Sequence, residues 1–128
     1  MRIGTRLSAL AVGLFLAALP ALAADVTGKW TTEFDSQIGP QKYTFDLKVD
    51  GEKVTGKAHF ERMGQTGDVD LLEGKLVGDQ ISFVETFQFE ANEVRIQYTG
   101  KVKGDEITLT RDVGGFAKEE IVAHRVKD

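Results

Sequence analysis

Cysteine is absent from the chain, so neither a disulfide nor a thiolate-ligated zinc ion contributes to its stability. The 128 residues include only two histidines, and no nucleophile elbow, phosphate-binding loop or dinucleotide fingerprint occurs. The 16 basic and 20 acidic residues are interspersed without a basic stripe, which argues against a nucleic-acid partner. These absences favour a function that uses no metal, no cofactor and no catalysis.

Residues 1–23 have the order of a secretory signal peptide. Two arginines precede an apolar stretch at 7–18, and a small-x-small cleavage sequence follows at 21–23. The apolar stretch is shorter than the about 20 residues that a membrane-spanning helix needs. We therefore expect cleavage after Ala23 and a single mature domain, residues 24–128, located in the periplasm or secreted. An uncleaved anchor is the alternative.

A hairpin-like unit recurs three times, at intervals of about 26 residues, which is too short for a propeller blade. The copies at 51–55, 78–82 and 104–108 each begin with glycine followed by an acidic residue. Such a pair is typical of a tight β-hairpin turn, because glycine adopts positive φ without steric cost. Each unit therefore predicts a strand, a tight turn and a second strand.

The segments between these turns alternate apolar and polar residues with a period of two, and no helical period follows residue 24. This pattern predicts half-buried antiparallel strands. Eight strands are expected, at 27–34, 42–49, 54–62, 69–77, 81–89, 94–102, 107–112 and 117–126. A β-bulge is expected in the fourth, at Leu71-Leu72. Closing the first strand onto the last hides every apolar face, which predicts an all-β, eight-stranded antiparallel up-and-down barrel. A sandwich of two four-stranded sheets is the alternative.

The predicted barrel has two different ends. The tight turns lie at one end of the barrel. The loops at the other end are 35–41, 63–68, 90–93 and 113–116, and the first two of these are the longest. The end with the longer loops is the expected mouth. The strands are shorter than the about 9–11 residues of an outer-membrane strand, so we expect no membrane-embedded barrel.

Gly28-Lys29-Trp30 resembles the Gly-x-Trp sequence that opens the first strand of lipocalins. Arg125, in the last strand, resembles the arginine that packs across that tryptophan. The resemblance is to the calycin group of lipocalins, fatty-acid-binding proteins and avidin-like barrels, and it implies a cation–π contact that joins the first strand to the last. The alternative is that Trp30 is an ordinary core aromatic. The stretch 98–125 also resembles small exported bacterial proteins, a similarity that implies no function.

Two charged residues, Glu85 and Arg111, fall at positions where the alternation points inward. A buried charge needs a partner or a water-filled cavity. If the two pair, they can orient a polar group of a ligand, and an unpaired Arg111 would bind a carboxylate. A purely structural ion pair is the alternative. Tyr43 and Tyr98 bring hydroxyls to the same face.

The favoured hypothesis is an exported barrel that holds an apolar or amphipathic small molecule. Glu85 and Arg111 would orient it, with an aromatic lining of Trp30, Tyr43, Phe45, Phe83, Phe87, Phe89 and Tyr98. One alternative is a protein-interaction or inhibitor domain that acts through its loops, with Phe116 as an exposed anchor. Another is an enzyme that uses Glu85 as a general acid or base.

Overall fold

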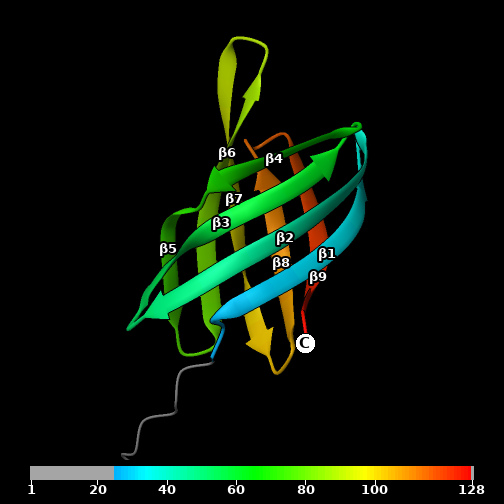
Figure 1. Ribbon diagram of the computed structural model, residues 1–128. Helices are drawn as coiled ribbons and strands as arrows, with labels where there is room; N and C mark the ends of the chain where they lie inside the picture. The colour runs from blue at the N-terminus through cyan, green and yellow to red at the C-terminus, as the bar shows by residue number, and fades with distance from the viewer. Residues whose placement is uncertain (1–24, 128) are drawn as a thin grey trace, which may run out of the picture.

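The computed structural model describes residues 25–127 and consists of β-strands joined by short turns (Figure 1). Nine strands follow one another: β1 (Gly28–Ser36), β2 (Gly39–Asp50), β3 (Lys53–Arg62), β4 (Gln65–Asp70), β5 (Leu72–Val77), β6 (Gln80–Phe89), β7 (Asn92–Lys103), β8 (Glu106–Val113) and β9 (Ala117–Arg125). Within this range there is no helix long and apolar enough to cross a membrane. The expected signal peptide and its cleavage site lie outside the described residues.

Neighbouring strands pair antiparallel, and the sheet closes on itself. Strand β3 pairs with β2 along one edge and with both β4 and β5 along the other, while β9 pairs with β1. Because β4 and β5 together occupy one position in the ring, the nine strands form a closed eight-stranded barrel. The predicted all-β barrel is confirmed, and the sandwich is wrong.

The predicted strand 69–77 is divided at Leu71, between β4 and β5. Glu73 has a positive φ of 54°, and the pairing register of β5 with β6 shifts between Leu72 and Lys75. The irregularity expected at Leu71-Leu72 is therefore present. It redirects the chain so that the first part of the segment, in β4, pairs with β3 and the second part, in β5, pairs with β6.

The three repeated Gly-acid pairs form the turns of one end of the barrel, as predicted. Each turn contains two residues, since Asp50 pairs with Lys53 and the other two copies pair in the same way. The first turn residue is a glycine with positive φ: Gly51 (64°), Gly78 (62°) and Gly104 (63°). Their acidic partners lack positive φ, which matches the type II′ hairpin that suits the twist of β-strands. We call this end, where the described chain also begins and finishes, the filled end.

The opposite end, called here the open end, lacks the long loops expected from the sequence. Ser36 pairs with Gly39 and Arg62 pairs with Gln65, so the first two connections are also two-residue turns. The prediction was wrong because glycine and proline near these turns indicated loops. At the second turn, Met63 and Gly64 both have positive φ, 52° and 74°, which is the requirement of a type I′ hairpin.

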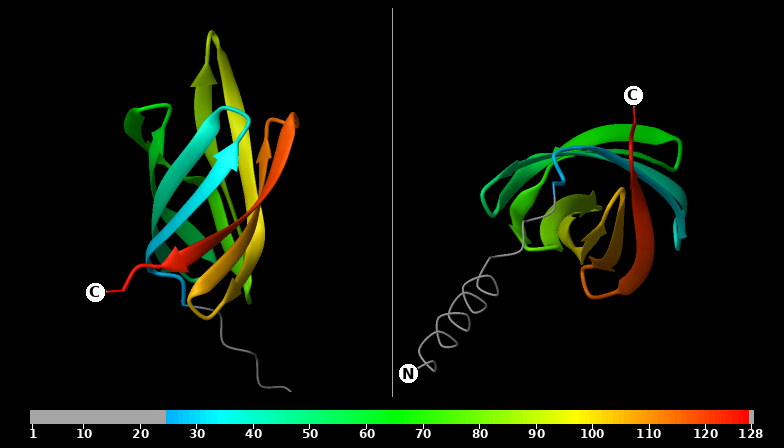
Figure 2. Two further views of the ribbon diagram at one scale, coloured as in Figure 1. Left: turned by 90° about the vertical axis from the view of Figure 1, so that its right-hand side faces the viewer. Right: turned by 90° about the horizontal axis from the view of Figure 1, so that it is seen from below.

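Pairing between β1 and β9 closes the barrel, and these two strands pair only near the filled end. Among the described residues these strands form two register pairs, Trp30 with Arg125 and Thr31 with His124. Beyond them the β1–β2 and β8–β9 hairpins separate toward the open end, as the left view of Figure 2 shows. The wall of the barrel is therefore continuous at the filled end, whereas β1 and β9 are separated at the open end.

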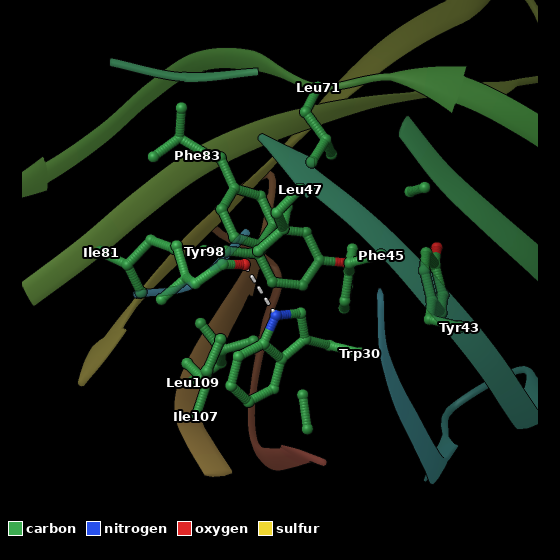
Figure 3. Close-up of a cluster of buried hydrophobic side chains, with 14 of the residues drawn as sticks. Trp30, Tyr43, Phe45, Leu47, Leu71, Ile81, Phe83, Tyr98, Ile107 and Leu109 are labelled. Carbon is green, nitrogen blue, oxygen red and sulfur yellow. Dashed lines mark hydrogen bonds between the residues drawn. The ribbon is translucent and has the colours of Figure 1, made fainter. Parts of the chain in front are cut away.

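Aromatic side chains pack the filled half of the interior (Figure 3). The rings of Phe83 and Tyr98 lie 4.9 Å apart, and Phe45 meets both edge-on. Trp30 donates from Nε1 to the Val26 carbonyl at 3.0 Å, and the Arg125 guanidinium lies 4.4 Å from the Trp30 ring. The cation–π contact implied by the lipocalin resemblance is present. Because side chains fill this half, the pocket described below lies toward the open end.

Candidate ligand pocket

Glu85 is fully buried at the boundary between the filled and the open half. Tyr43 donates its hydroxyl to Oε2 of Glu85 at 2.8 Å, and Tyr98 donates to Oε1 at 2.7 Å. Burial, together with the Glu85 charge, raises the pKa of Tyr43 to about 12 and raises the pKa of Tyr98 well above its ordinary value. Both hydroxyls therefore remain protonated and serve as donors to the carboxylate.

Arg111 contacts the same two tyrosines from the other side. Its Nε donates to the Tyr98 hydroxyl at 2.9 Å and its Nη2 to the Tyr43 hydroxyl at 3.3 Å. Its Nη1 donates to Oε1 of Glu119 at 2.6 Å. Burial opposes the charge of Arg111, but its tyrosine and Glu119 partners raise its pKa above the ordinary value. Glu85 and Arg111 are thus linked through the two tyrosine hydroxyls rather than directly, and Arg111 is paired with Glu119.

Arg62 is the third buried charged side chain of this layer, and it was not among the site residues predicted from the sequence. Its Nη1 donates to the Tyr43 hydroxyl at 2.8 Å and lies 3.7 Å from Oε2 of Glu85. The guanidinium is held between two rings, 3.7 Å from the centre of Phe60 and 4.2 Å from that of Phe87. The signal was available, because the inward alternation of 54, 56, 58 and 60 continues to 62. Arg62 was overlooked because a loop was expected to begin at the next residue, 63.

A pocket of about 780 Å³ lies above this layer, at the open end. Its floor is polar and its wall is mainly apolar, with contributions from all four hairpins of that end. The floor consists of Gln41, Arg62, Arg111 and Glu119, and the apolar wall includes Ile38, Phe87, Phe89, Ile96, Val113 and Phe116. A volume of this size falls in the range of about 300–1,000 Å³ that small-molecule sites occupy.

The structure divides the predicted site residues into three groups. Arg111 and Phe87 line the pocket, as does Phe89. Glu85, Tyr43 and Tyr98 form the polar layer directly beneath its floor, while Trp30, Phe45 and Phe83 belong to the packed core of the filled half. No group of three or more potential metal ligands lies together among residues 25–127.

Each of the four turns at the open end presents a large apolar side chain to solvent. Relative exposures are 42% for Ile38, 61% for Met63, 53% for Phe89 at the base of its turn, and 81% for Phe116. The turns at the filled end carry glycine with an acidic residue instead. This apolar rim, defined by the four residues just named, surrounds the mouth of the pocket.

Fold and site together define a small antiparallel β-barrel with a packed half and a polar-floored pocket at its open end. No protein-family model matches the chain, and neither a curated protein nor a solved structure is significantly similar to it. The lipocalin resemblance therefore stays an expectation from the sequence, and the structure shows a closed barrel in which Arg125 contacts Trp30.

Proposed function

We propose that the protein binds a small amphipathic molecule in the pocket at its open end. The observation that carries this proposal is the combination of an apolar wall with a charged and amide-bearing floor in one pocket of about 780 Å³. Small-molecule sites are typically concave and apolar, with a few polar groups that fix the orientation of the ligand. The polar part of the ligand would lie on Gln41, Arg62 and Arg111, and its apolar part between Phe87, Phe89 and Phe116.

The distribution of side chains along the barrel axis supports this arrangement. An eight-stranded barrel holds either its own side chains or one small ligand at any given level. Here Phe45, Phe83 and Trp30 fill the half near the chain ends, and the buried charges separate that half from the pocket. Glu85 does not line the pocket, so a catalytic role for its carboxylate has no geometric support.

A fluorescent apolar probe tests the proposal. N-phenyl-1-naphthylamine titrated into residues 24–128 should show saturable emission enhancement with one site per chain. Val94→Trp, which places a large ring in the pocket, should weaken probe binding about tenfold or more, whereas Val77→Trp at the filled end should not. Absence of saturable binding to the wild type, or equal binding to both variants, refutes the proposal.

The proposed setting is outside the cytoplasm, in the periplasm or the medium, since the first 23 residues have the order of an export signal. Native mass spectrometry of the protein purified from its own host tests both setting and occupancy. We expect a chain that begins at Ala24 and carries a bound small molecule. A cytoplasmic chain that retains Met1 would overturn the proposed setting.

A second candidate function is protein interaction through the apolar rim. The observation that favours it is the solvent exposure of two large apolar side chains of the rim, Phe116 at 81% and Met63 at 61%. Met63 does not line the pocket, so Met63→Ser separates the two functions. If the rim binds a protein, this variant should lose a partner that the wild type retains at fixed stoichiometry, while its affinity for the probe stays unchanged.

A further inference from the structure

The side-chain amide of Gln41, a residue that lines the pocket, leaves one acceptor without a partner among the described residues. Ser36 Oγ donates its single proton to the Gly39 carbonyl at 2.8 Å, so it can only accept from Gln41 at 2.7 Å. The Gln41 atom that faces Ser36 is therefore the NH₂ group, and the amide orientation is fixed. Gln41 is 4% exposed, and its Oε1 is buried without a hydrogen-bond partner among the described residues.

Arg62 supplies spare donors beside that acceptor. Gln41 and Arg62 are register partners on β2 and β3, which places their side chains next to each other on the inner face. Only Nη1 of Arg62 donates a hydrogen bond to another described residue, the Tyr43 hydroxyl. The guanidinium lies against the Phe60 and Phe87 rings, and its Nε and Nη2 donate no hydrogen bond to another described residue.

The charges of the polar layer already balance. Arg62 and Arg111 face Glu85 and Glu119 across distances of 3.7 Å and 2.6 Å. A carboxylate on the floor would add a third negative charge to two positive ones in a partly desolvated site, and it would bring no donor for Gln41. An uncharged group that contains both a carbonyl and an N–H satisfies both neighbours at no cost in charge.

We propose that the polar group recognised in this pocket is an uncharged carboxamide: its C=O accepts from Arg62 and its N–H donates to Gln41 Oε1. This inference rests on the proposed function and specifies the class of ligand for that site. The unpaired buried acceptor supplies the selectivity, because a ligand without a donor leaves Gln41 Oε1 unsatisfied.

Ligands with the same alkyl chain test the inference at neutral pH by displacement of N-phenyl-1-naphthylamine. Decanamide offers donor and acceptor, methyl decanoate offers an acceptor alone, and decanoate offers a charged acceptor alone. We expect decanamide to bind about tenfold more tightly than either of the others. Equal displacement by amide and ester, or tightest binding of decanoate, overturns the inference while the proposed function stands. Failure of the probe itself to bind overturns both.

A matched pair of variants assigns the selectivity to its residue. Gln41→Met removes the acceptor at similar side-chain volume. This variant should therefore bind decanamide and methyl decanoate about equally. Gln80→Met, at the exposed start of β6 near the filled end, should keep the wild-type preference. Retention of the preference in Gln41→Met also overturns the inference, and the ligand series on the wild type remains decisive if that variant does not fold.

Discussion

Alkaline titration tests the buried charged layer directly, because the chain contains only two tyrosines and both belong to that layer. Tyr43 has an ordinary pKa of 10.0 in the unfolded chain and a pKa of about 12 in the barrel. A raised pKa means that the folded state holds the phenolic proton more tightly. The associated stability is complete below pH 10 and is lost as the pH rises from about 10 to about 12.

The size of the loss follows from the shift in pKa. Each pH unit over which only the unfolded chain releases the proton costs about 1.4 kcal/mol, so Tyr43 accounts for roughly 2 kcal/mol at pH 12, where the folded chain begins to release the proton too. Tyr98, whose pKa is also raised by burial and by Glu85, adds a loss of the same sign. Together they remove a large part of the about 5–15 kcal/mol that stabilises a typical domain. We expect the barrel to unfold in this pH interval.

The assay follows tyrosinate absorbance and the emission of the single tryptophan, Trp30, during the same titration. Both signals should change in one cooperative step, since neither tyrosine ionises while the barrel is folded. In Tyr43→Phe, the slope of unfolding free energy against pH above 10 should fall by about 1.4 kcal/mol per unit. Ionisation of either tyrosine near pH 10 with Trp30 emission unchanged would refute the reasoning.

Three further predictions concern stability, each measured as the urea midpoint at constant slope. Glu85→Gln should destabilise the barrel by about 3–5 kcal/mol, because it leaves two buried arginines with too few carboxylates. The control Glu120→Gln, on the outer face, should change stability by less than about 0.5 kcal/mol. Similar values for both variants would contradict the proposed charge network. Arg125→Ala should cost about 1–2 kcal/mol and alter Trp30 emission, because it removes the contact across the β1–β9 closure; unchanged emission would count against that contact. Gly100→Ala should cost about 1–3 kcal/mol or more, since its Cβ would lie 2.0 Å from a backbone carbonyl oxygen of β8; a neutral effect would show that β7 can move away from β8.

Much of the fold was predictable because a period of two is a local property of the sequence. The strand positions, the hairpin turns at Gly51, Gly78 and Gly104, and the inward placement of Glu85 and Arg111 all follow from residues that are close in the chain. The turn at Met63 was not predictable, since a methionine with positive φ contradicts the usual preference for asparagine or glycine there.

The partners of the buried charges could not be derived from local patterns. Tyr43 reaches Glu85 across 42 positions of the chain and Arg111 across 68, through the interior rather than along a shared edge. Which inward residues meet depends on the diameter and the stagger of the barrel, and alternation fixes neither quantity. For the same reason the sequence could not show that side chains fill one half of the interior and leave the other half free.

The closure of the ring at the filled end also governs access to the interior. Beyond Thr31 no ladder hydrogen bonds join the first and last hairpins among residues 25–127, so the hairpins can separate without breaking any strand pairing. Arg111 of the last hairpin contacts the first hairpin across this gap, 5.0 Å from the Phe34 ring and 3.3 Å from the Tyr43 hydroxyl. Under the proposed function, a ligand wider than the resting aperture would enter with the strand pairing of the sheet intact. The energy of admission is largely separate from the energy that keeps the barrel folded.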